Sequence, residues 1–140
     1  MPVRAPLAAA LLAALVLGAC GGSPADEKAV KRTVKGVYDA LAEKDAARVC
    51  DAISAEGKRK LVRSPAARSG NGQSCRDVFG FSLAFAGDDL KQAKNAEVTD
   101  VTVDGDQAKA TVRYRNRETD VGLVKQGGQW KLSGLDLAGG

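Results

Sequence analysis

The sequence contains no histidine and only three cysteines among its 140 residues. Histidine is the side chain that most often moves protons near neutral pH, so its absence excludes histidine-based acid–base catalysis and serine–histidine nucleophiles. The chain also lacks a CxxC pair, a GxSxG sequence and the glycine spacing of a phosphate-binding loop. We therefore expect no metal site and no cofactor.

A hydrophobic run long enough to cross a bilayer is also missing. The most apolar run, from Pro6 to Ala19, has about fourteen residues, whereas a membrane-spanning helix needs roughly 20. Arg4 precedes this run, and Leu17-Gly18-Ala19-Cys20 ends it. A basic start, a short apolar core and small residues before a cysteine resemble the lipobox signal of bacterial lipoproteins. The sequence therefore predicts a signal peptide over residues 1–19.

The lipobox resemblance implies a covalent membrane anchor. In lipoproteins of this type the cysteine after the cleavage site carries a diacylglycerol thioether, and the new N-terminus is often acylated as well, for example with palmitate. Cys20 would then hold the protein at the extracytoplasmic face of the cell membrane, with residues 20–26 as the lipidated cysteine and a flexible tether. An ordinary secretory signal that happens to precede a cysteine is the alternative.

The residues after Cys20 correspond in number to one domain. Their twenty basic and seventeen acidic side chains give a net charge of +3, which is too weak to indicate nucleic acid as a partner. Two cysteines remain, Cys50 and Cys75, and two thiols in a small exported domain usually pair. The predicted disulfide closes a loop of about 25 residues and stabilises the fold by roughly 3 kcal/mol.

Helical periodicity fills the first half of this domain. From Glu27 to Lys44 apolar residues recur at helical spacing, with basic residues on the opposite side. That basic side is either a solvated helix face or a surface for anionic lipid headgroups. The predicted N-caps of further helices are Asp45, Ser54 and Ser74. Gly87 is expected to end the last helix, and residues 64–73 are expected to form an exposed loop.

From Ala96 onward the apolar period changes from helical spacing to alternation. Turns are expected at Asp104-Gly105, at residues 116–118 and at Gly127-Gly128. Four strands joined by such turns form an antiparallel meander. Helices followed by strands are typical of an α+β domain, so we expect the N-terminal helices to pack on a curved four-stranded antiparallel sheet.

Several stretches carry a resemblance to a known family. They are Tyr38-Asp39-Ala40-Leu41-Ala42-Glu43-Lys44-Asp45, the helices with Cys50 and Cys75, Val101-Thr102-Val103-Asp104-Gly105-Asp106-Gln107-Ala108 and Gly128-Gln129-Trp130-Lys131-Leu132. Their order resembles the NTF2-like or cystatin-like cone domains found in many small bacterial lipoproteins and implies such a domain over residues 27–138. In that family a curved sheet wraps the long helix and leaves a pocket between them.

The side chains expected to face this pocket are almost all apolar. Possible lining residues are Tyr38, Val112, Tyr114, Trp130 and Leu132. The two tyrosines could together hold a carbonyl group, although buried tyrosines with a satisfied hydroxyl are the commoner case. The carboxylates that fall off the predicted inner faces are Asp39, Asp51, Asp100 and Asp120. The predicted pocket therefore lacks a positioned acid or base.

These features lead to three functional hypotheses. The first is a membrane-anchored, non-catalytic domain that binds a small apolar ligand or another protein of the cell envelope. The alternative is a small isomerase- or dehydratase-like enzyme that uses the cone pocket, because one fold can host many functions. The enzyme hypothesis requires a carboxylate with a raised pKa inside the pocket. The third is a structural or regulatory partner in an envelope complex, with the sheet as a dimer face.

Overall fold

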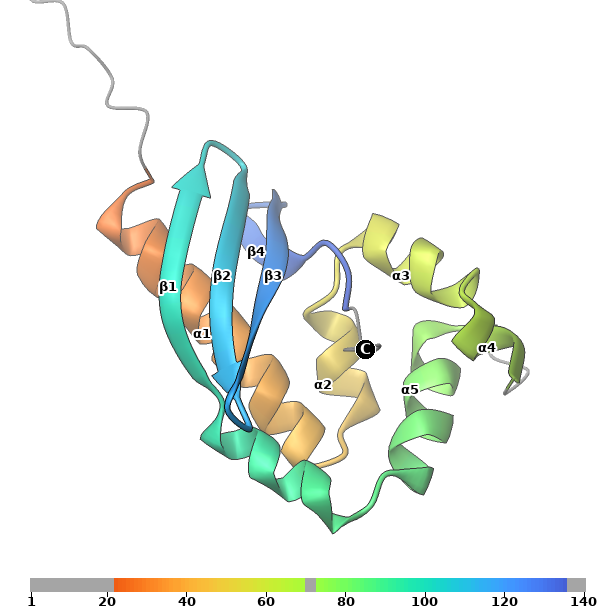
Figure 1. Cartoon of the computed structure of the whole chain (residues 1–140). Coiled ribbons are helices and arrows are strands. Elements are labelled where there is room, and N and C mark those ends of the chain that lie inside the picture. Colours follow the sequence, from red (N-terminus) through yellow and green to blue (C-terminus); the bar gives the residue numbers. More distant parts are fainter. Residues whose placement is uncertain (1–21, 70–72, 136–140) are drawn as a thin grey trace, which may run out of the picture.

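The structure, a computed structural model, describes residues 22–69 and 73–135, so the predicted signal peptide and Cys20 lie outside the described residues. Helices come first and strands follow (Figure 1). The helices are α1 (Pro24–Ala42), α2 (Ala46–Asp51), α3 (Ala55–Val62), α4 (Pro65–Ser69), α5 (Cys75–Phe85) and the 3-10 helix η1 (Asp88–Asn95). The strands are β1 (Glu97–Asp104), β2 (Gln107–Tyr114), β3 (Arg117–Gln126) and β4 (Gln129–Leu132).

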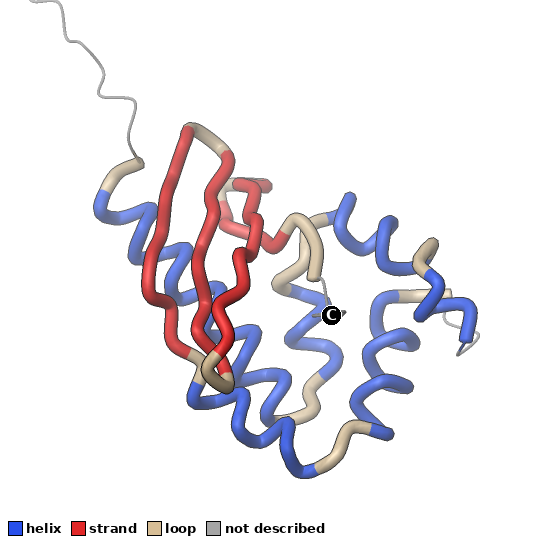
Figure 2. The backbone as a smooth tube through the Cα atoms, in the orientation of Figure 1, coloured by secondary structure: helices blue, strands red, loops and turns tan. Residues whose placement is uncertain are grey.

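The four strands form one antiparallel sheet in the order β1-β2-β3-β4, which confirms the predicted α+β meander. Figure 2 shows the strands gathered in one layer, with the long helix α1 behind them. Helix α1 contacts β1, β2 and β4, while α5 packs against α2 and α3. The sheet is not closed, and the free edge of β4 is covered where Leu132 pairs with Ile53 at the end of α2.

A bulge explains the irregular apolar spacing in β1. The register with β2 is interrupted between Val98 and Asp100, which leaves Thr99 as the extra residue. A bulge of this kind shifts the alternation of side chains by one position. Val98 and Val101 therefore lie on the same side as the buried Val103, although they are three residues apart.

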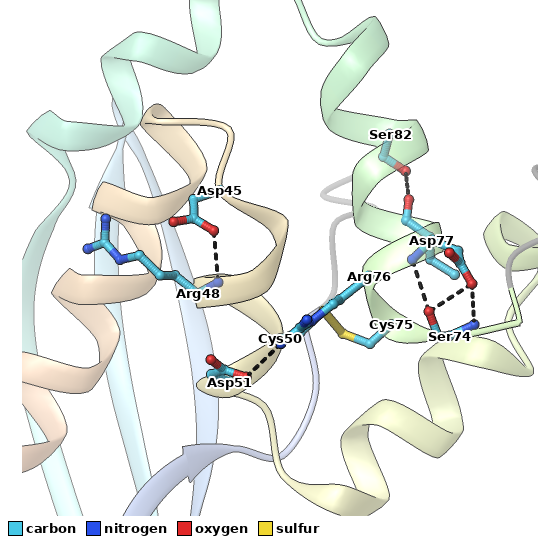
Figure 3. The surroundings of a disulfide bond; sticks show 10 residues. Asp45, Arg48, Cys50, Asp51, Ser74, Cys75, Arg76, Asp77 and Ser82 are labelled. Atoms are coloured by element: carbon cyan, nitrogen blue, oxygen red, sulfur yellow. Dashed lines mark hydrogen bonds and ion pairs between the residues drawn. A yellow bond between two sulfur atoms is a disulfide. The ribbon is translucent and has the colours of Figure 1, made fainter.

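The predicted N-caps are all confirmed. Side-chain oxygens of Asp45, Ser54 and Ser74 accept hydrogen bonds from backbone N–H groups in the first turn of α2, α3 and α5. Ser74 also forms a capping box with Asp77, whose carboxylate accepts a hydrogen bond from the Ser74 backbone N–H at 3.0 Å (Figure 3). Local polar signals thus fix where these helices begin.

Helix α1 begins earlier than predicted. It starts at Pro24 rather than Glu27, because Ser23 caps it and proline suits the first helical position. Residues 24–26, which the sequence analysis assigned to the tether, therefore form the first turn of the helix. This correction matters because Asp26 makes specific contacts with the sheet.

Two further predictions about the helical region were wrong. The segment 64–73 contains the short helix α4, which starts at Pro65. Gly87 has an extended backbone with φ −65°, so it does not end α5 in a left-handed cap but precedes η1. The hairpin turns after β1 and β2 also differ slightly, since their central residues are Gly105-Asp106 and Arg115-Asn116. The Gly127-Gly128 turn is as predicted, with φ +58° and +75°.

The core lies between α1, the helices α2 and α5, and the inner face of the sheet. Alternate strand residues and the apolar stripe of α1 supply it, as the periodicity predicted. The largest fully buried side chains are Val30, Val34, Val37, Val49, Phe79, Val112, Leu123 and Leu132. Phe79 from α5 belongs to the same cluster, so the helical part and the sheet share one core.

Candidate functional site

Tyr38 and Tyr114, which the sequence analysis placed in one pocket, meet in the structure. Their ring centroids are 6.1 Å apart with the planes tilted by 57°. Tyr38 comes from the second half of α1 and Tyr114 from the end of β2, so helix and sheet each supply one wall. Burial raises the pKa of the Tyr38 hydroxyl, and the neighbouring Tyr114 contributes in the same direction. The Tyr38 hydroxyl therefore stays protonated near neutral pH and can donate a hydrogen bond.

The Tyr114 hydroxyl is hydrogen-bonded to the backbone of η1. It donates to the carbonyl oxygen of Asp89 at 3.3 Å, and the Arg115 guanidinium donates to the same oxygen at 2.7 Å. Arg115 also lies against the Tyr114 ring, 5.1 Å from its centroid. These hydrogen bonds connect the start of η1 to the turn between β2 and β3.

A cavity of about 540 Å³ opens beside the two tyrosines. Its apolar lining comes from α1, η1, β2, β3 and the segment after β4, and includes Tyr38, Leu41, Leu90, Ala93, Tyr114, Val121 and Leu135. Its volume falls in the range of small-molecule sites, which are usually apolar with a few polar groups. We name this space the tyrosine cavity.

The polar residues of the tyrosine cavity are Lys60, Thr119, Asp120 and Ser133. The Asp120 carboxylate is directed to the outer face of the sheet, where it accepts from Thr111 at 2.9 Å and from Lys109 at 3.1 Å. The Thr111 hydroxyl and then Lys109 lower the Asp120 pKa. This direction is opposite to the one that a general acid requires.

The five predicted lining residues do not share one pocket. Tyr38 and Tyr114 line the tyrosine cavity, but Val112 and Leu132 are each 1 % exposed and belong to the hydrophobic core. Trp130 is also buried and borders a different space on the other side of α1. The reason is that α1 packs on the inner face of the sheet and buries these side chains in the core.

Trp130 is held by a contact that the sequence did not reveal. Its indole Nε1–H donates to Oδ1 of Asp26 at 2.9 Å, and Lys125 Nζ lies at 2.9 Å from the same oxygen. Lys125 also lies over the Trp130 ring at 5.5 Å from its centroid. These donors hold the pKa of Asp26 at about 2, chiefly through the Lys125 and Trp130 hydrogen bonds.

A groove of about 520 Å³ runs beside this cluster. It is lined by residues of α1, α2 and β4, and the charged members of this lining are Arg32, Arg48, Lys131 and Asp51. We name it the arginine groove. The basic side of α1 is visible in the sequence, but no local pattern indicates that it lies beside α2 and β4.

The predicted disulfide between Cys50 and Cys75 is present, with an S–S distance of 2.07 Å and a Cα–Cα distance of 5.9 Å. Figure 3 shows that it ties α2 to the first turn of α5. Both cysteines are buried, at 2 % and 7 % exposure. The bridge therefore has a structural role in joining the two helices.

The described residues also lack a membrane-spanning helix and a group of metal ligands. In residues 22–69 and 73–135 no helix is both long and apolar enough to span a membrane. The same part of the chain contains no group of three or more potential metal ligands among its Cys, Asp and Glu side chains. Ser54 is its one buried polar residue, and its hydroxyl is used as the N-cap of α3.

The first described residue is held against the sheet. The Gly22 backbone N–H donates to the carbonyl oxygen of Val103 at 3.2 Å. A Cβ atom at Gly22 would lie 2.2 Å from Cβ of Val103, so only glycine allows this approach. Cys20 precedes Gly22 by two residues, which span at most about 7 Å.

Compared with known proteins, the chain matches no family model, no curated protein and no solved structure.

Proposed function

We propose that this chain is a lipid-anchored protein of the bacterial cell envelope, with an NTF2-like domain that binds a small, largely apolar ligand without catalysis. The observation that carries the binding role is the tyrosine cavity, because two tyrosines border a largely apolar space of about 540 Å³. The anchor part depends on the lipobox ending at Cys20.

The distance between the N-terminal end of the domain and the tyrosine cavity is compatible with both parts of this proposal. The start of α1 and the β1–β2 turn lie at one end of the molecule, at the upper left of Figure 1. Gly22 is hydrogen-bonded to Val103, close to that turn. Tyr38 is fourteen residues after Pro24, so about 21 Å of helix separates them at 1.5 Å per residue. Tyr114 is likewise at the end of β2 remote from that turn. A lipid on Cys20 would thus leave the cavity away from the membrane and open to the aqueous phase.

The chemistry of the cavity favours binding over catalysis. The chain has no histidine, and the Asp120 carboxylate beside the cavity is paired on the outer face with a lowered pKa. An isomerase-like mechanism needs a carboxylate that stays protonated or takes a proton at the substrate. The Asp120 geometry gives that alternative no support.

The anchor is tested by labelling cells with radioactive palmitate. The wild-type protein should incorporate the label and sediment with membranes, whereas Cys20→Ser should do neither. Cys75→Ser is the matched control, because it removes a different cysteine and should leave the label in place. A Cys20→Ser protein that is still labelled would overturn the anchor.

The cavity is tested with the full-length protein purified from its own envelope. A bound small molecule should appear as extra mass under native conditions. Tyr114→Ala removes one wall and should abolish that mass. Phe85→Ala is the matched control, since Phe85 is 77 % exposed on α5 and does not line the cavity. Loss of the mass in both variants, or in neither, would reject the cavity as the binding site.

A further inference from the structure

The arginine groove is separate from the tyrosine cavity, and the two have no lining residue in common. Arg32 and Thr33 from α1, Arg48 from α2 and Lys131 from β4 come together there. Elements that are distant in sequence thus converge on one cationic surface. Three positive side chains face one carboxylate, Asp51, so an anion entering the groove is favoured electrostatically.

The three cations are not equally engaged within the protein. Arg48 is paired with Glu43 from the end of α1, and Lys131 Nζ donates to the carbonyl oxygen of Asp51 at 2.6 Å. Among the described residues Arg32 makes no hydrogen bond or ion pair through its side chain. Its guanidinium therefore has all five N–H donors available for a ligand.

Gly36 gives an independent indication that the groove is used. Glycine inside a helix costs about 1 kcal/mol relative to alanine, and a packing constraint is the usual reason for it. Here no heavy atom lies within 4 Å of the position that a Cβ atom would occupy, and the backbone is not left-handed. Neither packing nor conformation requires glycine at this position. The structural consequence of Gly36 is a deeper groove, because the residue lines it.

The chemistry of the groove indicates what it binds. A guanidinium fork matches the oxygens of a phosphate group, and phosphate spreads its charge over several oxygens that two arginines and a lysine can share. We propose that the arginine groove binds a phosphate group, with Arg32 as the main contact and Arg48 and Lys131 as supporting charges.

The phosphate can come from two sources. The groove runs from Ala29 to Gly36 along the middle of α1, about 8 to 18 Å from Pro24 at 1.5 Å per residue. One source is the headgroup of an anionic phospholipid, and this source rests on the proposed anchor. The other is a soluble phosphate ester, which does not depend on the anchor.

The first experiment measures thermal unfolding of the full-length protein with inorganic phosphate or with chloride at equal ionic strength. Phosphate bound to the native state should raise the midpoint in proportion to its occupancy. Arg32→Gln should weaken phosphate binding about tenfold, because it removes the charge-assisted contacts. Lys28→Gln is the matched control, since it removes one charge from the exposed side of α1 outside the groove. An equal response in both variants would overturn the proposal.

The Gly36→Ala variant distinguishes an effect on phosphate binding from an effect on the stability of the protein. Because a Cβ atom at this position meets no neighbour, the variant should unfold at a higher temperature than the wild type in chloride. It should nevertheless lose most of the response to phosphate, since the methyl group projects into the groove. A stabilised Gly36→Ala protein that retains the full phosphate response would also contradict the proposal.

The second experiment identifies the source and uses the Cys20→Ser protein, which cannot be lipidated at that residue. It is mixed with vesicles of phosphatidylglycerol or of phosphatidylcholine and then floated. Arg32-dependent binding to phosphatidylglycerol that inorganic phosphate does not displace identifies the headgroup. Displacement by inorganic phosphate identifies a soluble ester instead. No response to inorganic phosphate and no Arg32-dependent flotation would overturn the proposal, while the palmitate and cavity tests would stand unaffected.

Discussion

The Asp26 carboxylate accepts a hydrogen bond from the Trp130 indole at 2.9 Å, across 104 positions of the sequence. Asp26 lies in the first turn of α1 and Trp130 in the last strand, so this contact joins the beginning of the domain to its end. Lys125 contacts the same carboxylate oxygen. The start of α1 is thereby fixed to β3 and β4 immediately after the predicted anchor.

The Asp26 contact predicts a pH-dependent stability. The folded-state pKa of Asp26 is about 2 against an ordinary value of 3.8. A depressed pKa stabilises the folded protein above the ordinary value, and this contribution is lost as the pH falls from about 4 towards 2. Asp26→Asn should therefore be less stable than the wild type in urea unfolding at neutral pH, and the gap should narrow over that acid range.

Asp100→Asn is the control for this titration. Asp100 is exposed on β1 and makes no side-chain hydrogen bond or ion pair within the described residues. Its replacement should leave the unfolding free energy unchanged at neutral pH. A stability gap for Asp26→Asn that stays constant down to the acid limit would show that its charge is not the source of the effect.

Removing the disulfide should lower stability. Cys50 and Cys75 enclose a sequence separation of 25 residues, and a bridge over a loop of that size stabilises by roughly 3 kcal/mol through the unfolded state. The Cys50→Ser, Cys75→Ser double variant should lose about this much in chemical unfolding. Addition of a reductant should destabilise the wild type similarly and leave the double variant unaffected. A reductant effect on both proteins would point to a different cause.

Two phenylalanines of α5 should respond in opposite ways to truncation. Phe79 is fully buried, so Phe79→Ala leaves a cavity and should cost about 3 to 5 kcal/mol of unfolding free energy. Phe85 is 77 % exposed and contacts Phe81 at a centroid distance of 4.8 Å. Phe85→Ala should change stability by less than about 0.5 kcal/mol, as expected for a surface position. Comparable losses in the two variants would mean that the helix faces are assigned wrongly.

Two helical glycines should also differ. A Cβ atom at Gly57 would lie 2.7 Å from Cγ2 of Ile53 and 2.9 Å from the carbonyl oxygen of Ser133. Gly57→Ala should therefore destabilise the protein by about 1 to 3 kcal/mol, in spite of the better helix propensity of alanine. Gly36→Ala, which meets no neighbour, should instead stabilise by up to about 1 kcal/mol. Thermal unfolding of both proteins checks the difference, and stabilisation by Gly57→Ala would contradict the packing described at α3.

Local signals allowed much of the fold to be predicted. The caps at Asp45, Ser54 and Ser74 act through side-chain hydrogen bonds to the next turn, so a few neighbouring residues decide them. The alternation from Ala108 to Tyr114 likewise depends only on strand geometry. The disulfide followed from having two cysteines in an exported domain.

The errors arose where weak local signals competed. Pro65 after Ser64 is a helix start, but the glycines and asparagine that follow led to a loop prediction for the whole segment. In η1 only Leu90 and Ala93 carry the apolar pattern over eight residues, too few to indicate a helix. The bulge at Thr99 was implicit in the three-residue spacing of the β1 valines.

The candidate site was predicted only in part. The periodicity places Tyr38 and Tyr114 on the inner faces of a helix and a strand, and in the structure their ring centroids are 6.1 Å apart. The pattern could not tell that Val112 and Leu132 are covered by helices while the tyrosines border open space. Long-range contacts such as Asp26 with Trp130, and the arginine groove, have no local signature, since each requires the tertiary arrangement of elements distant in sequence.

The most direct test of the proposed function is a native mass spectrum of the wild-type protein released from its own cell envelope. The proposal predicts a chain that begins at Cys20, carries the mass of a diacylglycerol group and retains one further small molecule of defined mass. A chain with an unmodified Cys20 would contradict the anchor, and a lipidated chain without any bound molecule would contradict the ligand-binding role of the tyrosine cavity.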